Sequence, residues 1–258
     1  MGRDGGSLWY HAGVKRLAKR LVVGTRWEAP VKRAHHAVTR SRNSLYDAQT
    51  IAIMARVLRP DSNAVDVGAL EGGMLRHMIR LAPRGRHVAF EPLPDHYAAL
   101  AARFTQVEVH PYALGEAPGD EDYVRVLRFP ALSGLSRRPD LGRAATETIR
   151  VRVETLDRVL PPDRPLSLIK VDVEGGELGV FRGAKETLRR HRPIVVFECG
   201  LAAAGAGATP DAIHDALAEG GLRVSTLQAW LEGGVPLSRQ GFGDAVLGNR
   251  EFYFIAHP

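Results

Sequence analysis

The chain has 258 residues, of which 45% are hydrophobic and 25% charged, a composition typical of a single α/β domain with a small extension. Cys199 is the only cysteine, so an intramolecular disulfide and a cysteine-rich zinc site are both excluded. The apolar runs are strand-sized, which argues against a transmembrane helix, and the N-terminus lacks the order of a secretory signal. We therefore expect a cytoplasmic protein.

The net charge of +6 comes from the N-terminal quarter of the chain. Residues 1–60 hold 12 Lys and Arg against 3 Asp and Glu, whereas residues 61–258 hold 23 against 26. Of the 35 basic residues, 30 are arginine, a bias more typical of GC-rich coding than of selection for phosphate contacts. No nucleic-acid partner is expected.

Two helices are predicted in this basic quarter, over residues 8–22 and 46–58. The first has apolar side chains at helical spacing and Lys and Arg side chains opposite. It either packs on the domain or touches an anionic membrane surface or an acidic carrier. We interpret 1–60 as an N-terminal extension, which could complete a pocket or form a homodimer contact, and 61–258 as the main domain.

From residue 63 onward, short apolar strands alternate with amphipathic helices. This pattern predicts right-handed βαβ units and a doubly wound, mostly parallel sheet of about seven strands. The predicted strands are 64–68, 87–90, 107–110, 123–127, 149–153, 166–171, 194–197, 222–227 and 252–255, and the predicted helices are 74–81, 95–103, 176–190 and 210–219.

The residues that follow each parallel strand indicate the site, because ligands bind at the carboxyl ends of the strands in such sheets. After the first strand come Asp66, Gly68, Gly72 and Gly73. The glycines favour a sharp turn that lets a ligand approach the backbone. Taken alone, this signal is also consistent with a tight turn between strand and helix.

Glu91 ends the second strand, 23 residues after Gly68. An acidic side chain at this distance can accept both hydroxyls of a ribose, so the pair indicates a cofactor that contains adenosine. A dinucleotide fold needs a glycine where this chain has Leu70, and Asp66 and Glu71 would repel a pyrophosphate. The cationic donor S-adenosylmethionine fits this acidity, whereas NAD does not.

Three more carboxylates follow the next two strands. Asp172 and Glu174 come at the carboxyl end of the strand over 166–171, and Glu198 at the end of the strand over 194–197. Some of these carboxylates are also explained by their place at a helix N-terminus, where the helix dipole favours negative side chains.

Together these motifs resemble the FkbM family of S-adenosylmethionine-dependent methyltransferases. Five sequence motifs agree with the family in order and spacing over residues 63–200. Each motif is common by itself, but the combination of all five in the same order and spacing is specific. They are VDVGA at 65–69, AFEP at 89–92, YALG at 112–115, TLD at 155–157 and LIKVDVEGGE at 168–177. The first loop differs, because relatives often carry Asn-x-Gly where this chain has Leu70, Glu71 and Gly72.

The resemblance implies a class I methyltransferase (Rossmann-like) fold with strand order 3-2-1-4-5-7-6 and an antiparallel seventh strand. It also implies methyl transfer, usually to a hydroxyl of a sugar, polyketide or related secondary metabolite. By match of motif, the first loop would line the methionine end of the cofactor, Glu91 would hold the ribose, Ala113 would meet the adenine and Asp172 would lie near the methyl. The first-loop contacts are Asp66, Gly68, Ala69 and Gly72.

An alcohol acceptor must lose its proton near the transition state. Asp172, Glu198 and His110, each at a predicted strand end, are the candidate bases, and the like charge of Glu174 is expected to raise the pKa of Asp172. Asp172 could instead only bind cofactor. No ligand spacing supports a metal, although Asp172 and Glu198 could hold a divalent ion.

The loop over 130–143 has the length and composition of a mobile lid or of a surface loop, and it carries Arg137 and Arg138, which could meet an acidic substrate group. We expect an O-methyltransferase acting on a small molecule. The alternatives are an N-methyltransferase that acts on an amine, and a non-catalytic module that binds the cofactor or a lipid surface.

Overall fold

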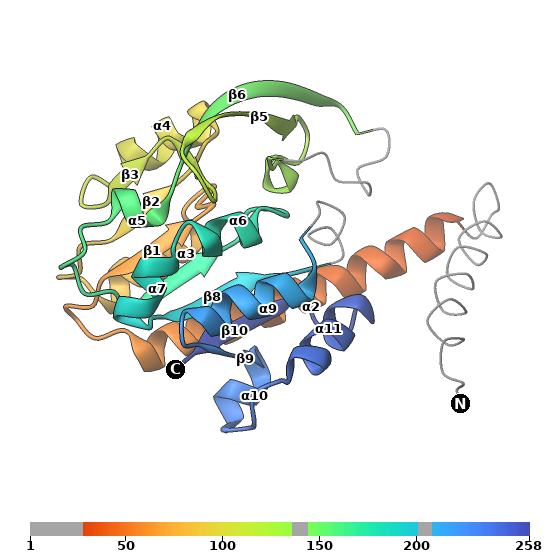
Figure 1. Ribbon diagram of the computed structural model, residues 1–258. Helices are drawn as coiled ribbons and strands as arrows, with labels where there is room; N and C mark the ends of the chain where they lie inside the picture. The colour runs from red at the N-terminus through yellow and green to blue at the C-terminus, as the bar shows by residue number, and fades with distance from the viewer. Residues whose placement is uncertain (1–27, 136–143, 201–207) are drawn as a thin grey trace. The chain divides into compact units, whose positions relative to one another are not determined.

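The main sheet has seven strands in the order β3-β2-β1-β7-β8-β10-β9 (Figure 1). The computed structural model describes residues 28–135, 144–200 and 208–258, with side chains from residue 42 onward. The strands are β1 (Ala64–Val67), β2 (Val88–Phe90), β3 (Glu108–His110), β7 (Leu168–Val171), β8 (Ile194–Glu198), β9 (Arg223–Thr226) and β10 (Tyr253–His257).

This strand order confirms the predicted fold. β7 and β8 take the fourth and fifth places, and β10, the last strand of the chain, lies between β8 and β9 and runs antiparallel to both. The pairs from β3 to β8 are all parallel. The carboxyl ends of β1, β2, β7 and β8 therefore meet at one edge of the sheet, which is where the predicted site residues lie.

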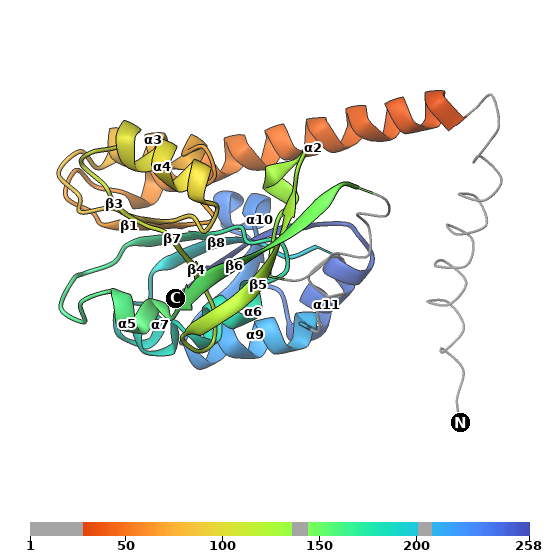
Figure 2. The ribbon, with the colours of Figure 1, turned by 90° about the horizontal axis from the view of Figure 1, so that it is seen from above.

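Helices cover both faces of the sheet (Figure 2). On one face, α3, α4 and the last turns of α2 enclose a core that includes Met54, Met78 and Leu100. On the other, α5, α6, α7, α9 and α11 bury a larger core around Phe197 and Phe242. The helices are α2 (Glu28–Val57), α3 (Gly73–Leu81), α4 (Pro94–Arg103), α5 (Leu156–Val159), α6 (Glu177–Arg182), α7 (Lys185–His191), α9 (Pro210–Glu219), α10 (Leu227–Glu232) and α11 (Arg239–Leu247).

A second, three-stranded sheet has the order β4-β6-β5 and comprises β4 (Tyr112–Leu114), β5 (Gly119–Val126) and β6 (Thr146–Glu154). β5 and β6 pair antiparallel over eight residues each, and in Figure 1 they form a curved ribbon above α6. Leu93, Ala113, Tyr123 and Val153 make a small core beneath this ribbon. A short 3-10 helix, η1 (Pro130–Leu132), follows β5.

One predicted helix is wrong in its extent. The pattern over 176–190 predicts a single helix, but the structure has α6 and α7 with a break at Gly183 and Ala184. A Cβ on Gly183 would come 2.0 Å from the carbonyl oxygen of Gly115. The turn after β4 approaches the helix so closely at this point that tertiary packing overrides the continuous apolar pattern.

The N-terminal region is described only in part. The chain divides into two units, residues 1–48 and 49–258. The predicted helix over 46–58 forms the last part of α2, which begins at Glu28. The predicted basic helix over 8–22, and Arg137 and Arg138 of the predicted lid, lie outside the described residues. None of the described helices combines the length and the apolar character needed to cross a membrane.

Candidate active site

The turn between β1 and α3 is shaped by two glycines in the left-handed region. Gly68 has a φ of 78°, and a Cβ there would come 2.0 Å from the carbonyl oxygen of Asp172. Gly72 has a φ of 73°, and its Cβ would come 2.4 Å from the ring of Phe104. Neither position can therefore take a side chain unless a neighbouring group moves. The Gly68 turn lies directly against the segment that carries Asp172.

The rest of this turn is held by backbone hydrogen bonds. The amides of Gly68 and Ala69 both donate to the carbonyl oxygen of Phe90, at 3.0 and 3.1 Å. Leu70 has a φ of 48°, a conformation that asparagine adopts more easily than leucine does. The strain at Leu70 gives a physical reason why an asparagine would suit this loop.

Glu91 lies beside the same turn and is only 3% exposed. Its Oε2 accepts a hydrogen bond from the Leu70 amide at 2.8 Å, and its Oε1 accepts one from the Leu93 amide at 3.0 Å. Burial raises the pKa of Glu91, and these two hydrogen bonds only partly offset that effect. Each carboxylate oxygen can accept a second hydrogen bond, so this side chain can still receive two hydroxyls.

A buried lysine links the carboxylates of β1 and β7. Lys170 is paired with Asp66 in the sheet register, and its Nζ lies 3.7 Å from Oδ1 of Asp66 and 3.2 Å from Oδ2 of Asp172. Burial by itself lowers the pKa of Lys170, but the two carboxylates outweigh it and raise that pKa. Lys170 is therefore a permanent cation between two strand-end acids.

Asp66 is almost completely buried, and burial raises its pKa despite the attraction of Lys170. Its Oδ1 has no hydrogen-bond partner among the described residues. Lys170, 3.7 Å away, is the cation nearest to this buried oxygen that the described residues supply.

Asp172 is the most strongly held carboxylate at the edge. Besides Lys170, it receives a hydrogen bond from the hydroxyl of Tyr253, 2.6 Å from Oδ2. Burial by itself raises the pKa of Asp172, but Lys170, a hydrogen bond with Glu198 and the hydrogen bond from Tyr253 together lower it below its usual value. The expected rise in this pKa is therefore wrong, because Lys170 and Tyr253 act in the opposite direction to the like charge of Glu174.

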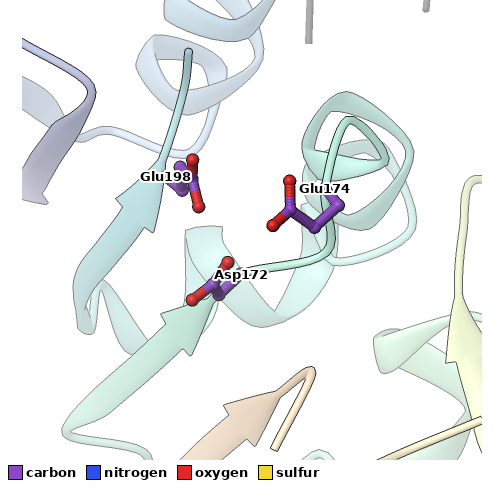
Figure 3. A group of neighbouring side chains, drawn as sticks. All are labelled: Asp172, Glu174 and Glu198. Carbon is purple, nitrogen blue, oxygen red and sulfur yellow. The ribbon is translucent and has the colours of Figure 1, made fainter. Parts of the chain in front are cut away.

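The carboxylates of Asp172, Glu174 and Glu198 face one another (Figure 3). One oxygen of each lies within 4.8 Å of the other two, and all three side chains are half-buried. Glu174 has a φ of 55°, in the loop that joins β7 to α6. Acidic groups gather in this way at many sites without an ion, so the spacing alone does not indicate a metal.

The first part of the predicted lid lies against this group. A Cβ on Gly134 would come 3.0 Å from the carbonyl oxygen of Glu174. The Tyr123 hydroxyl donates to the Ser133 carbonyl at 3.0 Å, and the Val126 amide donates to Ser133 Oγ at the same distance. Residues 130–135 are therefore tied to β5 beside the carboxylates, and 136–143 lie outside the described residues.

His110 and Ala113 lie apart from the carboxylate group. The His110 ring stacks between those of Phe90 and Tyr112, with centroids 5.3 and 5.4 Å away, and its Nε2 is 3.1 Å from Glu108 Oε1. Ala113 is 7% exposed, within the core of the small sheet. Their roles as base and adenine contact stay predictions.

The structure adds Lys170 and Tyr253 to the residues that the sequence singled out. A lysine within the apolar strand over 168–171 was a usable signal, since a buried ammonium needs anionic partners. Tyr253 left no comparable signal, because it is 81 residues from Asp172 and comes close only through the pairing of β10 with β8.

These features fit the predicted methyl donor. Four carboxylates, Asp66, Asp172, Glu174 and Glu198, lie at or near one edge with Lys170 as the cation in contact with two of them. The excess of negative over positive side chains at this edge suits a ligand with a sulfonium and an ammonium group.

Comparisons with known proteins agree with the motifs. The family model described as the methyltransferase FkbM domain matches residues 66–224. A curated protein, the AMB antimetabolite synthetase AmbE of Pseudomonas aeruginosa, is 28% identical over 218 residues, covering 69% of this chain and 10% of that protein. The chain thus spans about a tenth of that relative's length.

Two solved structures are also similar. A methyltransferase FkbM from Methylobacillus flagellatus aligns with a TM-score of 0.49 and 16% identity, covering 78% of this chain and 44% of that one. A TehB-like S-adenosylmethionine-dependent methyltransferase from Corynebacterium glutamicum aligns with a TM-score of 0.41 and 12% identity, covering 87% of this chain and 96% of that one.

Proposed function

We propose that this chain, which belongs to the FkbM family of S-adenosylmethionine-dependent methyltransferases, transfers a methyl group to a hydroxyl of a small molecule. The observation that carries the proposal is the pair of neighbouring carboxylates of Asp172 and Glu198, which lies beside the glycine turn at Gly68. This pair supplies a proton acceptor next to the loop proposed to hold the donor. A sugar or a secondary metabolite is the proposed acceptor, and the similarity to a curated antimetabolite synthetase supports that class.

In this proposal the donor's methionine end lies along the β1–α3 turn, next to Asp66, Gly68, Ala69 and Gly72. Glu91 holds the ribose, and its two backbone hydrogen bonds keep the carboxylate in one orientation before any ligand arrives. Ala113 meets the adenine, and Asp172 lies at the methyl. These assignments follow the family motif, and the titration below tests that of Glu91.

Bound S-adenosylmethionine supplies a methyl carbon that is activated by its sulfonium leaving group. The chain has to align the acceptor oxygen about 3 Å from that carbon and exclude water. As the oxygen–carbon bond forms, the acceptor hydroxyl becomes far more acidic, so an ionised carboxylate suffices to take its proton. The lowered pKa keeps Asp172 ionised at neutral pH, so that its carboxylate can accept this proton.

The first test is calorimetric titration of S-adenosylhomocysteine into the wild-type protein and the variants Glu91→Gln and Glu121→Gln. Glu121 is an exposed glutamate on β5 and serves as the control. We expect micromolar binding by wild type and by the control, and about tenfold weaker binding by Glu91→Gln, the loss of about one hydrogen bond to a charged group. No binding by the folded wild type would overturn the proposal.

The second test identifies the acceptor atom. The protein and S-adenosylmethionine are incubated with matched sugars and amino sugars, and products are located by mass spectrometry and NMR. Methylation of hydroxyl oxygens supports the proposal. Methylation of amines alone would replace it by the N-methyltransferase alternative, and donor binding without any turnover would favour the non-catalytic one.

A further inference from the structure

Two donors converge on one oxygen of Asp172. The Tyr253 hydroxyl lies 2.6 Å and Lys170 Nζ 3.2 Å from Oδ2. Two donors on the same oxygen fix the rotation of a carboxylate, and hydrogen bonds to charged groups are the stronger kind. The Asp172 side chain remains 26% exposed, and in Figure 3 its carboxylate faces Glu174 and Glu198.

Tyr253 reaches this position from the antiparallel strand of the sheet. It is the first residue of β10 and pairs in register with Glu198 at the end of β8. The site therefore includes a side chain from the last strand of the chain, at residue 253 and outside the stretch 66–224 that the family model covers.

We propose that Tyr253 is a positioning residue for methyl transfer, which acts with Lys170 to hold the Asp172 carboxylate in one orientation toward the cationic end of the methyl donor. This inference rests on the proposed function. Without the hydroxyl, only Lys170 of these two donors remains on Oδ2, and the orientation of the carboxylate is less restricted. The negative charge would then no longer be held toward the sulfonium. The pKa of Asp172 agrees, because the hydrogen bond from Tyr253 is one of the effects that lower it.

The test compares two ligands that differ by one methyl group and one charge. S-adenosylmethionine carries the sulfonium, whereas S-adenosylhomocysteine has a neutral thioether, and each is titrated into wild type, Tyr253→Phe and Tyr97→Phe at the same pH and salt. Tyr97 is a half-buried tyrosine on α4 and is the matched control. We expect Tyr253→Phe to bind S-adenosylmethionine about tenfold more weakly and to bind S-adenosylhomocysteine within about twofold of wild type.

A double-mutant cycle asks whether Tyr253 acts through Asp172. We expect Asp172→Asn to show the same selective loss, and Tyr253→Phe to have no further effect in that background. Equal weakening of both ligands, or no change for either, would overturn the inference while leaving the proposed function intact. If the folded wild type binds neither ligand, the proposed function fails, and the inference fails with it.

Discussion

Glu177 opens α6 with its side chain almost fully buried, 1% exposed. Its Oε1 accepts a hydrogen bond from the Gly175 amide at 3.1 Å, but its Oε2 has no partner among the described residues. Burial raises its pKa from the ordinary 4.5 to about 7, despite the hydrogen bond from Gly175. The folded state therefore binds a proton more tightly than the unfolded state does.

The consequence is a pH-dependent loss of stability. The pKa of Glu177 is higher in the folded state than in the unfolded state. The contribution of this side chain to the free energy of unfolding is therefore complete below about pH 4.5 and is lost as the pH rises through 7. We expect Glu177→Gln, which stays neutral, to raise the free energy of unfolding at pH 8 by about 3 kcal/mol and to change it little at pH 4.5. Urea unfolding at both values measures this, with Glu121→Gln as the exposed control. Equal free energies of unfolding for wild type and Glu177→Gln at pH 8 would contradict it.

At the same scale, the sequence located the strand-end acids but not their partners. Asp66, Glu91, Asp172 and Glu198 were predicted because each lies at or just after a parallel strand, and local pattern places strand ends. The direction of the Asp172 pKa was wrong, because it depends on Lys170 and Tyr253, whose distance from that carboxylate is set by side-chain packing across the sheet.

At the scale of the element, the N-terminus of α3 offers two neighbouring glycines with opposite requirements. Gly72 is held at a φ of 73° with the Phe104 ring 2.4 Å from where a Cβ would be, whereas a Cβ on Gly73 would meet nothing within 4 Å. Gly73 is the first helical residue of α3. An alanine at residue 72 is therefore strained and overpacked, whereas an alanine at residue 73 stabilises the helix.

We expect Gly72→Ala to lower the free energy of unfolding by about 3 kcal/mol, the sum of left-handed strain and overpacking. We expect Gly73→Ala to raise it by about 0.5 kcal/mol through helix propensity. Urea unfolding of the two variants beside wild type measures both. A shift of the same sign for both variants would show that the neighbours at Gly72 do not decide the outcome.

Elements with strong local signals were predicted well. The helix over 210–219 is observed as α9 with the same limits, because Thr209 caps it through a hydrogen bond from the Ala212 amide and Pro210 starts it. The short elements β4, α5, α10 and α11 were not predicted. Elements of three to nine residues show too few periods to be distinguished from loops.

At the scale of the whole molecule, the boundary between extension and domain stays a prediction. The sequence placed it at residue 60, and Ile53 and Met54 are fully buried, with Met54 in the core that α3 and α4 enclose. We expect a chain that begins at Gln49 to unfold cooperatively. A chain that begins at Asp61 lacks both side chains and should lose several kcal/mol of stability.

Thermal unfolding of the two truncated chains, followed by circular dichroism, measures this. The matched comparison isolates twelve residues, 49–60. If the chain from Asp61 melts as cooperatively and at the same temperature as the chain from Gln49, the domain needs nothing before residue 61 and the boundary at 60 is supported.

The sequence by itself determined the fold class, the order of the strands, the family and the acids at the carboxyl edge of the sheet. The fold class and the strand-end acids follow from periodicity and glycine turns, which are local along the chain, whereas the strand order follows from the resemblance of the motifs to the FkbM family. Tertiary structure alone decided the break between α6 and α7 at Gly183, the contact of Gly134 with Glu174, and the network of Lys170, Asp172 and Tyr253. Those features join residues far apart in sequence, and their distances are set by sheet register and by the close packing of separate segments.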